Sequence, residues 1–106
     1  MAFIDLSALD EKEMVPGFHG RFVHTENMTF VYWDIKEGAT LPEHSHFHEQ
    51  VVNVINGELE FKAGDEERIM KPGEVAVIPG NTPHSAKGIT DCTVIDVFHP
   101  VREDYR

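Results

Sequence analysis

The sequence predicts an all-β domain, folded as a small sandwich or barrel. Short runs rich in β-branched and aromatic residues follow one another along the 106-residue chain, and glycine, proline and asparagine separate them. Only residues 5–14 have a helix-like pattern, with Ser7 as the candidate N-cap. About eight strands in a chain of this length fit one small barrel that is closed or nearly closed.

The strands are expected in order along the chain, with a turn signal after most of them. Asn56-Gly57 predicts a tight hairpin, because both positions of such a turn need positive φ. Gly64-Asp65 marks the next turn, and Pro72-Gly73 and Pro79-Gly80 bound the strand that lies between them. The expected strands span residues 21–25, 28–35, 49–55, 58–62, 67–70, 74–78, 84–87 and 92–98.

Length and composition predict a single domain over residues 1–106, with its core at about 20–100, an N-terminal arm at 1–19 and a short C-terminal tail. The net charge of −10 argues against a nucleic-acid partner, and an anionic ligand would need a local cation to capture it. No apolar run approaches the roughly 20 residues that span a bilayer, so no membrane partner is expected. The first residues lack the pattern of a secretory signal, which predicts a cytoplasmic protein. Cys92 is the single cysteine and is expected in the core.

A cluster of histidines between Gly38 and Gly57 predicts a metal site. His44, His46, His48 and Gln50 occupy alternate positions, and residues two apart in an extended strand point to the same face. Neutral imidazole is a common ligand of transition metals, and His84 lies downstream after another strand bounded by turns. Only some of the clustered imidazoles need be ligands, and the case for His48 is the weakest. His19, His24 and His99 have no such company and are interpreted as ordinary polar residues.

The histidine segments resemble the paired motifs of the cupin superfamily over roughly residues 30–98. The first cupin motif has the order Gly, His-x-His, Glu, Gly, and here Gly38, His44, His46, Gln50 and Gly57 occupy its positions. The resemblance implies a cupin domain: a double-stranded β-helix, or jelly-roll barrel, with a metal ion inside.

The second motif matches with two departures. Gly73, Pro79 and His84 fit its spacing, but Asn81 replaces a glycine and Gly88 replaces an asparagine. Asparagine tolerates the left-handed backbone better than most residues, so the turn at Asn81 is expected to survive.

Gln50 stands where most cupins carry glutamate. Three neutral imidazoles and a neutral amide oxygen would leave the full divalent charge on a bound ion, which predicts a stronger Lewis acid that favours an anionic ligand. The ligand types suit nickel, iron, manganese, zinc or copper, and do not choose among them.

The run His44 to Gln50, together with the tail DVFHPVREDYR, resembles the KdgF family of pectin-degradation cupins. That family opens 4,5-unsaturated uronate monosaccharides from pectin or alginate to the linear 5-keto-4-deoxyuronate, so the resemblance implies a redox-neutral, isomerase-type enzyme with this small molecule as substrate. It implies His44, His46, Gln50 and His84 as the ligands of one divalent transition metal ion, with His48 in the signature but not a ligand. It also implies Asp96, Phe98 and Arg102 as further site residues.

Chemistry suggests a role for each of the three tail residues within that resemblance. Asp96 and Phe98 share one face of the last expected strand, and a carboxylate in an apolar strand needs a partner or a function. We expect Asp96 to move a proton, Phe98 to shape the pocket and Arg102 to clamp the substrate carboxylate with its planar fork. Alone, Asp96 would more often face solvent, and Arg102 would more often belong to a solvated tail.

Three other functions stay open at this point. They are a cupin dioxygenase on a small organic substrate, a non-catalytic sugar- or uronate-binding cupin, and a protein with a purely structural metal. Dependence on oxygen, or binding without turnover, would distinguish the first two from an isomerase. Small cupins are often dimers, so a homodimer is expected.

Overall fold

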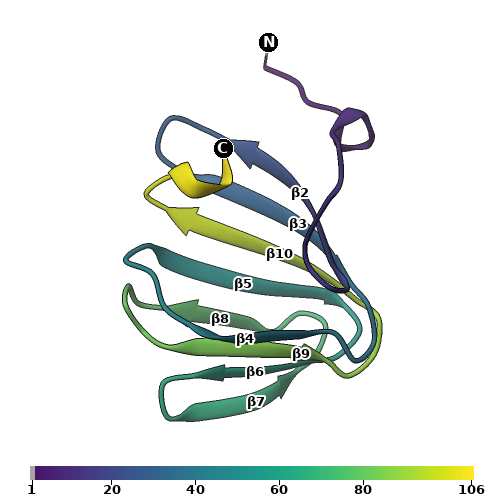
Figure 1. Cartoon of the computed structure of the whole chain (residues 1–106), viewed down its shortest axis with the longest axis vertical. Coiled ribbons are helices and arrows are strands. Elements are labelled where there is room, and N and C mark those ends of the chain that lie inside the picture. Colours follow the sequence, from purple (N-terminus) through teal and green to yellow (C-terminus); the bar gives the residue numbers. More distant parts are fainter. Residues whose placement is uncertain (1) are drawn as a thin grey trace.

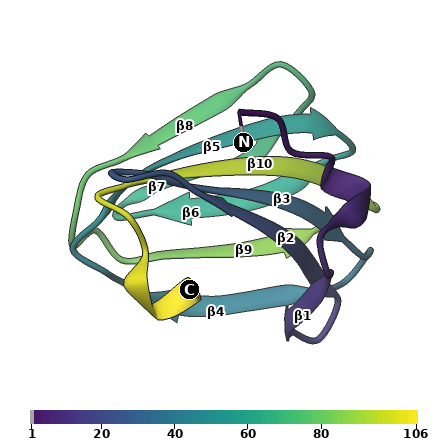
Figure 2. The same ribbon diagram turned by 90° about the horizontal axis from the view of Figure 1, so that it is seen from above.

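The chain folds into two antiparallel β-sheets that face each other (Figures 1 and 2). The computed structural model describes residues 2–106. The six-stranded sheet has the order β1 (Lys12–Val15), β2 (Phe18–His24), β3 (Thr29–Ile35), β10 (Cys92–His99), β5 (Glu49–Asn56) and β8 (Val75–Ile78). The four-stranded sheet has the order β4 (Thr40–His44), β9 (His84–Gly88), β6 (Leu59–Ala63) and β7 (Glu66–Met70). Strands far apart in the sequence are neighbours in both sheets, which confirms the predicted jelly-roll barrel.

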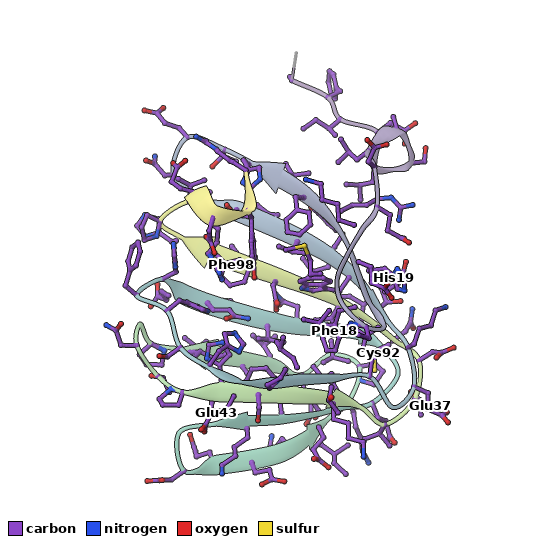
Figure 3. The ribbon with its side chains drawn as sticks, viewed as in Figure 1. Phe18, His19, Glu37, Glu43, Cys92 and Phe98 are labelled. Carbon is purple, nitrogen blue, oxygen red and sulfur yellow. The ribbon has the colours of Figure 1, made fainter. Side chains whose placement is uncertain are left out.

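Alternating burial along the strands builds the core between the two sheets. In β3 and β10 every second side chain is buried, which is the period of an extended strand with one face inward. The inward residues of the large sheet meet those of the small sheet; they include Val31, Ile35, Val52, Val54, Val94, Leu59 and Phe61. Figure 3 shows Phe18 and Cys92 toward one end of the strands and Phe98 toward the other. The buried position predicted for Cys92 is confirmed.

All eight predicted strands are present, with ends shifted by a few residues. The sequence did not predict β1 or β4. Strand β4 contains Pro42, and proline is tolerated there because β4 is an edge strand of its sheet.

The helix predicted over residues 5–14 is wrong. The structure has only a 3₁₀ turn, η1 (Leu6–Ala8), and its N-cap is Asp5, whose side chain accepts a hydrogen bond from the backbone N–H of Ser7 at 3.0 Å. The segment has no buried residue in η1 and then joins the large sheet as β1. An isolated helix this short is marginal in water, and pairing with β2 gives the backbone its hydrogen bonds instead.

Pro72-Gly73 and Pro79-Gly80 bound β8 as predicted, whereas the other two turn predictions have opposite outcomes. Gly64 and Asp65 join β6 to β7 as predicted, with Ala63 opposite Glu66. The hairpin at Asn56-Gly57 is wrong, because β5 and β6 belong to different sheets. Gly57 does have positive φ, and a Cβ there would lie 2.1 Å from the carbonyl oxygen of Asp91, so close approach also requires a glycine.

Two other features frame the site. Asn81 has φ of 64°, so the left-handed turn before β9 survives the replacement of glycine, as predicted. The chain ends in a second 3₁₀ turn, η2 (Glu103–Tyr105), which follows β10.

Within residues 2–106 no helix has the length and apolar character needed to cross a membrane.

Candidate functional site

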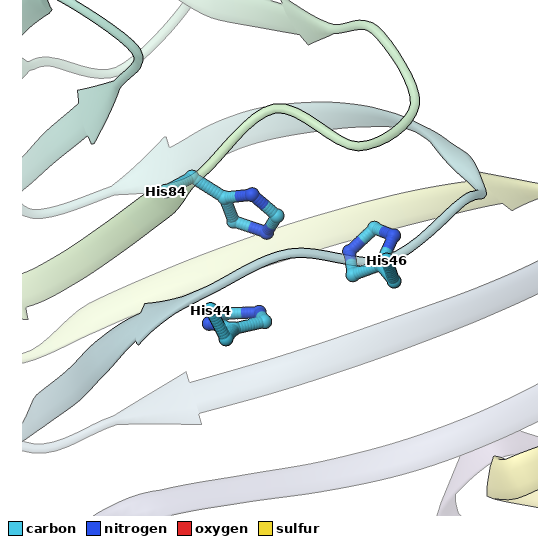
Figure 4. Close-up of side chains that lie close together, drawn as sticks. All are labelled: His44, His46 and His84. Carbon is cyan, nitrogen blue, oxygen red and sulfur yellow. The ribbon is translucent and has the colours of Figure 1, made fainter.

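Three histidine side chains meet at one end of the barrel (Figure 4). His44 is the last residue of β4, His46 lies in the connection to β5, and His84 is the first residue of β9. A ring nitrogen of each lies within 4.8 Å of a ring nitrogen of the others. His44 and His84 are directly opposite each other in the β4–β9 pair, which brings two distant segments together.

The predicted reason for this convergence was only partly right. His44, His46, His48 and Gln50 do not share one face of a single strand, because the chain turns between β4 and β5. His48 is not a member of the group of three, although its ring lies 5.3 Å from that of His46; it stacks on Phe47, with the centroids 3.9 Å apart.

Backbone carbonyls fix all three rings in the same way. The Nδ1–H groups donate to the carbonyl oxygens of Pro42, His48 and Thr82, at 2.9 Å from His44, 3.2 Å from His46 and 2.7 Å from His84. A carbonyl can only accept, so Nδ1 carries the proton in each neutral ring and Nε2 keeps its lone pair. The Nε2 atom of His84 is buried and has no hydrogen-bond partner among the described residues. Such anchoring of the far nitrogen is characteristic of metal-binding histidines.

Two of the rings, those of His46 and His84, have lowered pKa values. Burial is the main cause that lowers the pKa of His46 to about 4, and Arg102 and His84 add to it. Burial also lowers the pKa of His84, with smaller contributions from His44 and Arg102. At neutral pH both rings therefore present a lone pair rather than a positive charge.

Gln50 brings an oxygen to this cluster. It is the second residue of β5, is buried, and places Oε1 3.0 Å from Nε2 of His46. With Nδ1 of His46 already donating, the ring nitrogen and the amide oxygen offer lone pairs toward each other. A cation between them would satisfy both, so three imidazoles and one amide oxygen fit a divalent transition metal ion.

Asp96 adds a buried carboxyl group to the same face of the large sheet. Its Oδ2 accepts a hydrogen bond from the indole N–H of Trp33 at 3.0 Å, whereas Oδ1 is buried with no hydrogen-bond partner within residues 2–106. Desolvation raises the pKa of Asp96 to about 7, against the lowering effects of Trp33, Gln50 and Arg102. Asp96 is therefore not the solvent-facing residue that its type alone would suggest.

Arg102 is buried in the tail, and its fork is already occupied. Nε and Nη2 donate to the two carboxylate oxygens of Asp104, at 3.0 and 2.7 Å. The guanidinium lies over the ring of Tyr105, with Cζ 4.0 Å from the centroid, and 4.9 Å from that of Phe98. In the part of the chain that the structure describes, Nη1 is the one guanidinium nitrogen left buried without a partner. The expected two-point clamp of a substrate by this fork is therefore replaced by a single free donor.

Phe98 links the histidine cluster to this arginine. Its ring is buried and lies 5.6 Å from the ring of His46 and 5.9 Å from that of Tyr105, edge to face in both cases. It forms an apolar wall between the two polar groups.

These side chains surround one cavity of about 190 Å³, whose lining includes His44, Gln50, His84, Asp96, Phe98 and Arg102. A larger groove of about 490 Å³ lies between β7 and β8, but it is lined by surface acids and apolar strand residues and holds none of the histidines. The chemistry of the described residues is therefore concentrated in the smaller cavity. Such a combination of apolar walls and a few converging polar groups is typical of small-molecule sites.

Sequence reasoning missed three residues at this cavity. Trp33 and Tyr105 line it, and Asp104 holds the arginine. Trp33 has the same inward parity as Val31 and Ile35, so its burial was readable from the alternation of β3. Nothing in the sequence indicated that its indole would reach Asp96. Nor did it indicate that Asp104 would accept two hydrogen bonds from the guanidinium of Arg102.

The comparisons with known proteins agree with this geometry. The profile of the cupin domain matches residues 31–98, and no curated protein matches the chain. The structure of KdgF from a Halomonas species is similar with a TM-score of 0.93 and 30% identity, over 100% of this chain and 99% of that one. An RmlC-like cupin from Shewanella frigidimarina has a TM-score of 0.94 and 23% identity, over 100% and 96%. A variant of oxalate decarboxylase from Bacillus subtilis has a TM-score of 0.79 and 22% identity, over 92% and 29%. The last two likenesses show the fold alone.

Proposed function

The chain belongs to the cupin family, and we propose that it is a redox-neutral isomerase that opens the ring of 4,5-unsaturated uronate monosaccharides. The product would be the linear 5-keto-4-deoxyuronate. One observation carries the proposal: two members of a three-histidine group, His44 and His84, line a single cavity together with a buried carboxyl group and an arginine that has a free donor. The similarity to KdgF supports the same substrate class.

The reaction needs two proton movements and stabilisation of a transient negative charge. In the substrate, C5 of the C4=C5 double bond carries the ring oxygen and the C6 carboxylate, and C1 is a hemiacetal. Loss of the C1 hydroxyl proton and cleavage of the C1–ring oxygen bond give an aldehyde and an enolate at C5. Protonation of that enolate at C4 gives the ketone. The proton count balances, and no electrons leave the substrate.

His44, His46, His84 and Gln50 are the residues proposed to hold the metal ion. A divalent ion bound there would supply Lewis-acid stabilisation to the negative charge that develops on the enolate oxygen. The amide of Gln50 contributes an oxygen without a negative charge, so the chain itself does not offset that stabilisation. The ion is proposed to be nickel, iron, manganese, zinc or copper.

Asp96 is proposed as the proton carrier. Its pKa near 7 allows the carboxyl group to accept a proton and return it at neutral pH, which is the condition for efficient general acid–base catalysis. Its unpartnered Oδ1 is the oxygen available to the substrate.

Arg102 and Phe98 are proposed to orient the sugar. The free Nη1 of Arg102 would donate to the substrate carboxylate, and the charge of a buried guanidinium is one means by which a protein of net charge −10 can capture an anion. The ring of Phe98 would pack against the apolar face of the open-chain or cyclic sugar.

The test is to incubate the protein with freshly prepared unsaturated uronate near neutral pH, with and without oxygen, and to follow the double-bond absorbance. Loss of absorbance at equal rates under both conditions supports the isomerase. Strict dependence on oxygen would support a dioxygenase, and tight binding of the uronate without turnover would support a binding protein. A preference for pectin- or alginate-derived uronates, a homodimer and a cytoplasmic location stay predictions.

A further inference from the structure

We infer that Trp33 is a positioning residue whose indole N–H holds Asp96 in one orientation, so that Oδ1 is the carboxyl oxygen that exchanges protons with a bound substrate. The kinetic part of this inference rests on the proposed function. The contact itself does not, and can be tested without substrate.

The contact joins neighbouring strands on the inward face of the large sheet. Trp33 on β3 lies opposite Val94 on β10, and Asp96 lies two residues further along β10. The indole Nε1 of Trp33 is 3.0 Å from Oδ2 of Asp96, and both side chains are buried. A diagonal contact of this kind is within reach of a long aromatic side chain.

The indole has little freedom to move. Phe18 and Phe22 pack edge to face against it, with ring centroids 5.8 and 5.9 Å away. Gly20 lies directly opposite Trp33 on β2, and a Cβ at Gly20 would be only 2.8 Å from the indole Cζ3. The glycine thus leaves the room that the indole occupies, and the two phenylalanines fix the ring there.

The direction of the hydrogen bond assigns roles to the two carboxyl oxygens. An indole N–H can only donate, so Oδ2 must accept in either protonation state of Asp96. The carbonyl oxygen of a carboxylic acid is a better acceptor than its hydroxyl oxygen, so this hydrogen bond favours a proton on Oδ1. That oxygen is buried without a partner, and Asp96 lines the cavity. A carboxyl group without the indole could rotate and present either oxygen.

The contact is measured by NMR of protein with ¹⁵N-labelled tryptophan. Trp33 is the single tryptophan, so its indole N–H gives one signal. Asp96→Leu removes both acceptor oxygens while keeping the number of side-chain heavy atoms, and should move this signal upfield and speed its exchange with water. Asp34→Asn is the matched control, because Asp34 is the exposed neighbour on the opposite face of β3 and should leave the signal unchanged. An unchanged signal in Asp96→Leu would overturn the inference.

The consequence for catalysis is measured with Trp33→Phe, which keeps an aromatic ring but removes the N–H. We expect kcat to fall about ten- to hundredfold, because small errors in placing a catalytic group have effects of that size. KM and metal content should stay at wild-type values, whereas a loss of folded protein would lower kcat and metal content together. Gly20→Ala, which pushes on the indole without entering the cavity, should lower kcat in the same way.

A double-mutant comparison separates positioning from packing. In the Asp96→Asn background, Trp33→Phe should cause no further loss, because the group that it positions is already inactive. Equal losses in both backgrounds, or wild-type kcat in Trp33→Phe, would contradict the inference. If no variant or wild-type protein turns over the uronate while Asp96→Leu still moves the indole signal, the proposed function fails and the contact stands. If Trp33→Phe does not fold, the comparison of the Trp33 indole signal in wild-type and Asp96→Leu protein still tests the contact.

Discussion

The guanidinium of Arg102 makes a two-point pair with the carboxylate of Asp104, two residues further along the chain, at 3.0 and 2.7 Å. Arg102 is buried, whereas the side chain of Asp104 is 56% exposed. The pair therefore lies at the boundary between the cavity and solvent. It leaves one buried donor, Nη1, for an anion.

Arg102→Ala should chiefly weaken substrate binding. Loss of a hydrogen bond to a charged group corresponds to a rise in KM of about ten- to hundredfold, with kcat changed little. Steady-state kinetics on the unsaturated uronate provides the measurement. Arg106→Ala is the control, because that arginine pairs with exposed Glu103. A loss confined to kcat in Arg102→Ala would contradict the role of a binding donor.

Asp104→Asn should have a smaller effect of the same kind. The amide can no longer accept two charge-assisted hydrogen bonds, so the guanidinium loses its fixed orientation but keeps its stacking on Tyr105. We expect KM to rise less than in Arg102→Ala. If Asp104→Asn exceeds Arg102→Ala in effect, Asp104 acts on the substrate directly and the assignment is wrong.

Metal content should depend on the three histidines. Wild-type protein is expected to bind about one divalent ion per chain, and His44→Ala and His84→Ala should lose most of it, as measured by elemental analysis after dialysis. His99→Ala, which removes an exposed histidine at the end of β10, is the control. Wild-type metal content in both ligand variants would place the site elsewhere.

Gln50→Glu should retain or tighten metal binding and slow catalysis. A carboxylate is the stronger ligand, but its charge lowers the Lewis acidity of the centre. Metal titration and kcat on the uronate test the two effects separately. Full activity with tighter binding would show that the neutral amide is incidental.

Asp96→Asn should keep fold and metal while the rate falls about a hundred- to ten-thousand-fold, since an amide cannot carry the proton.

Asp96→Asn should also change the pH dependence of stability in metal-free protein. The pKa of Asp96 is raised from 3.8 to about 7 in the folded state. Between these values the folded state binds more protons than the unfolded state, so the free energy of unfolding falls as pH rises.

The stability difference between wild type and Asp96→Asn isolates this carboxyl group. As pH rises from about 4 to about 7, wild type should lose on the order of 4 kcal/mol relative to the variant, with no further change above that range. The buried histidines have lowered pKa values and give the opposite slope, but equally in both proteins, so they cancel. Urea unfolding at a series of pH values is the measurement, and a difference independent of pH would contradict the burial of Asp96.

Much of the fold could be predicted because strand alternation and turn residues are local signals. Strand β4 escaped prediction because Pro42 reads as a breaker, and only its edge position in the sheet makes it tolerable. Asn56-Gly57 has the local signature of a hairpin, but whether β6 folds back on β5 or crosses to the other sheet is decided by packing across the barrel.

The part of the site that could be predicted is the set of metal-ligand candidates, because the spacing of the histidines in the sequence is typical of such ligands. The histidine segments pointed to His44, His46 and His84, which the structure brings together. The contacts that orient Asp96 and Arg102 were not predictable. Trp33 and Asp96 are 63 residues apart, and their hydrogen bond depends on the register of β3 and β10. The occupied fork of Arg102 depends on the backbone turn of η2, which brings Asp104 back to it.

The central claim is that this cavity opens an unsaturated uronate and delivers a proton to C4. The most direct measurement is NMR of the product formed from fresh unsaturated uronate in D₂O without oxygen. The account predicts the linear 5-keto-4-deoxyuronate with one deuterium on one face of C4, formed much faster than in Asp96→Asn protein. Conversion no faster than in buffer alone, or label spread equally over both faces of C4, would contradict it.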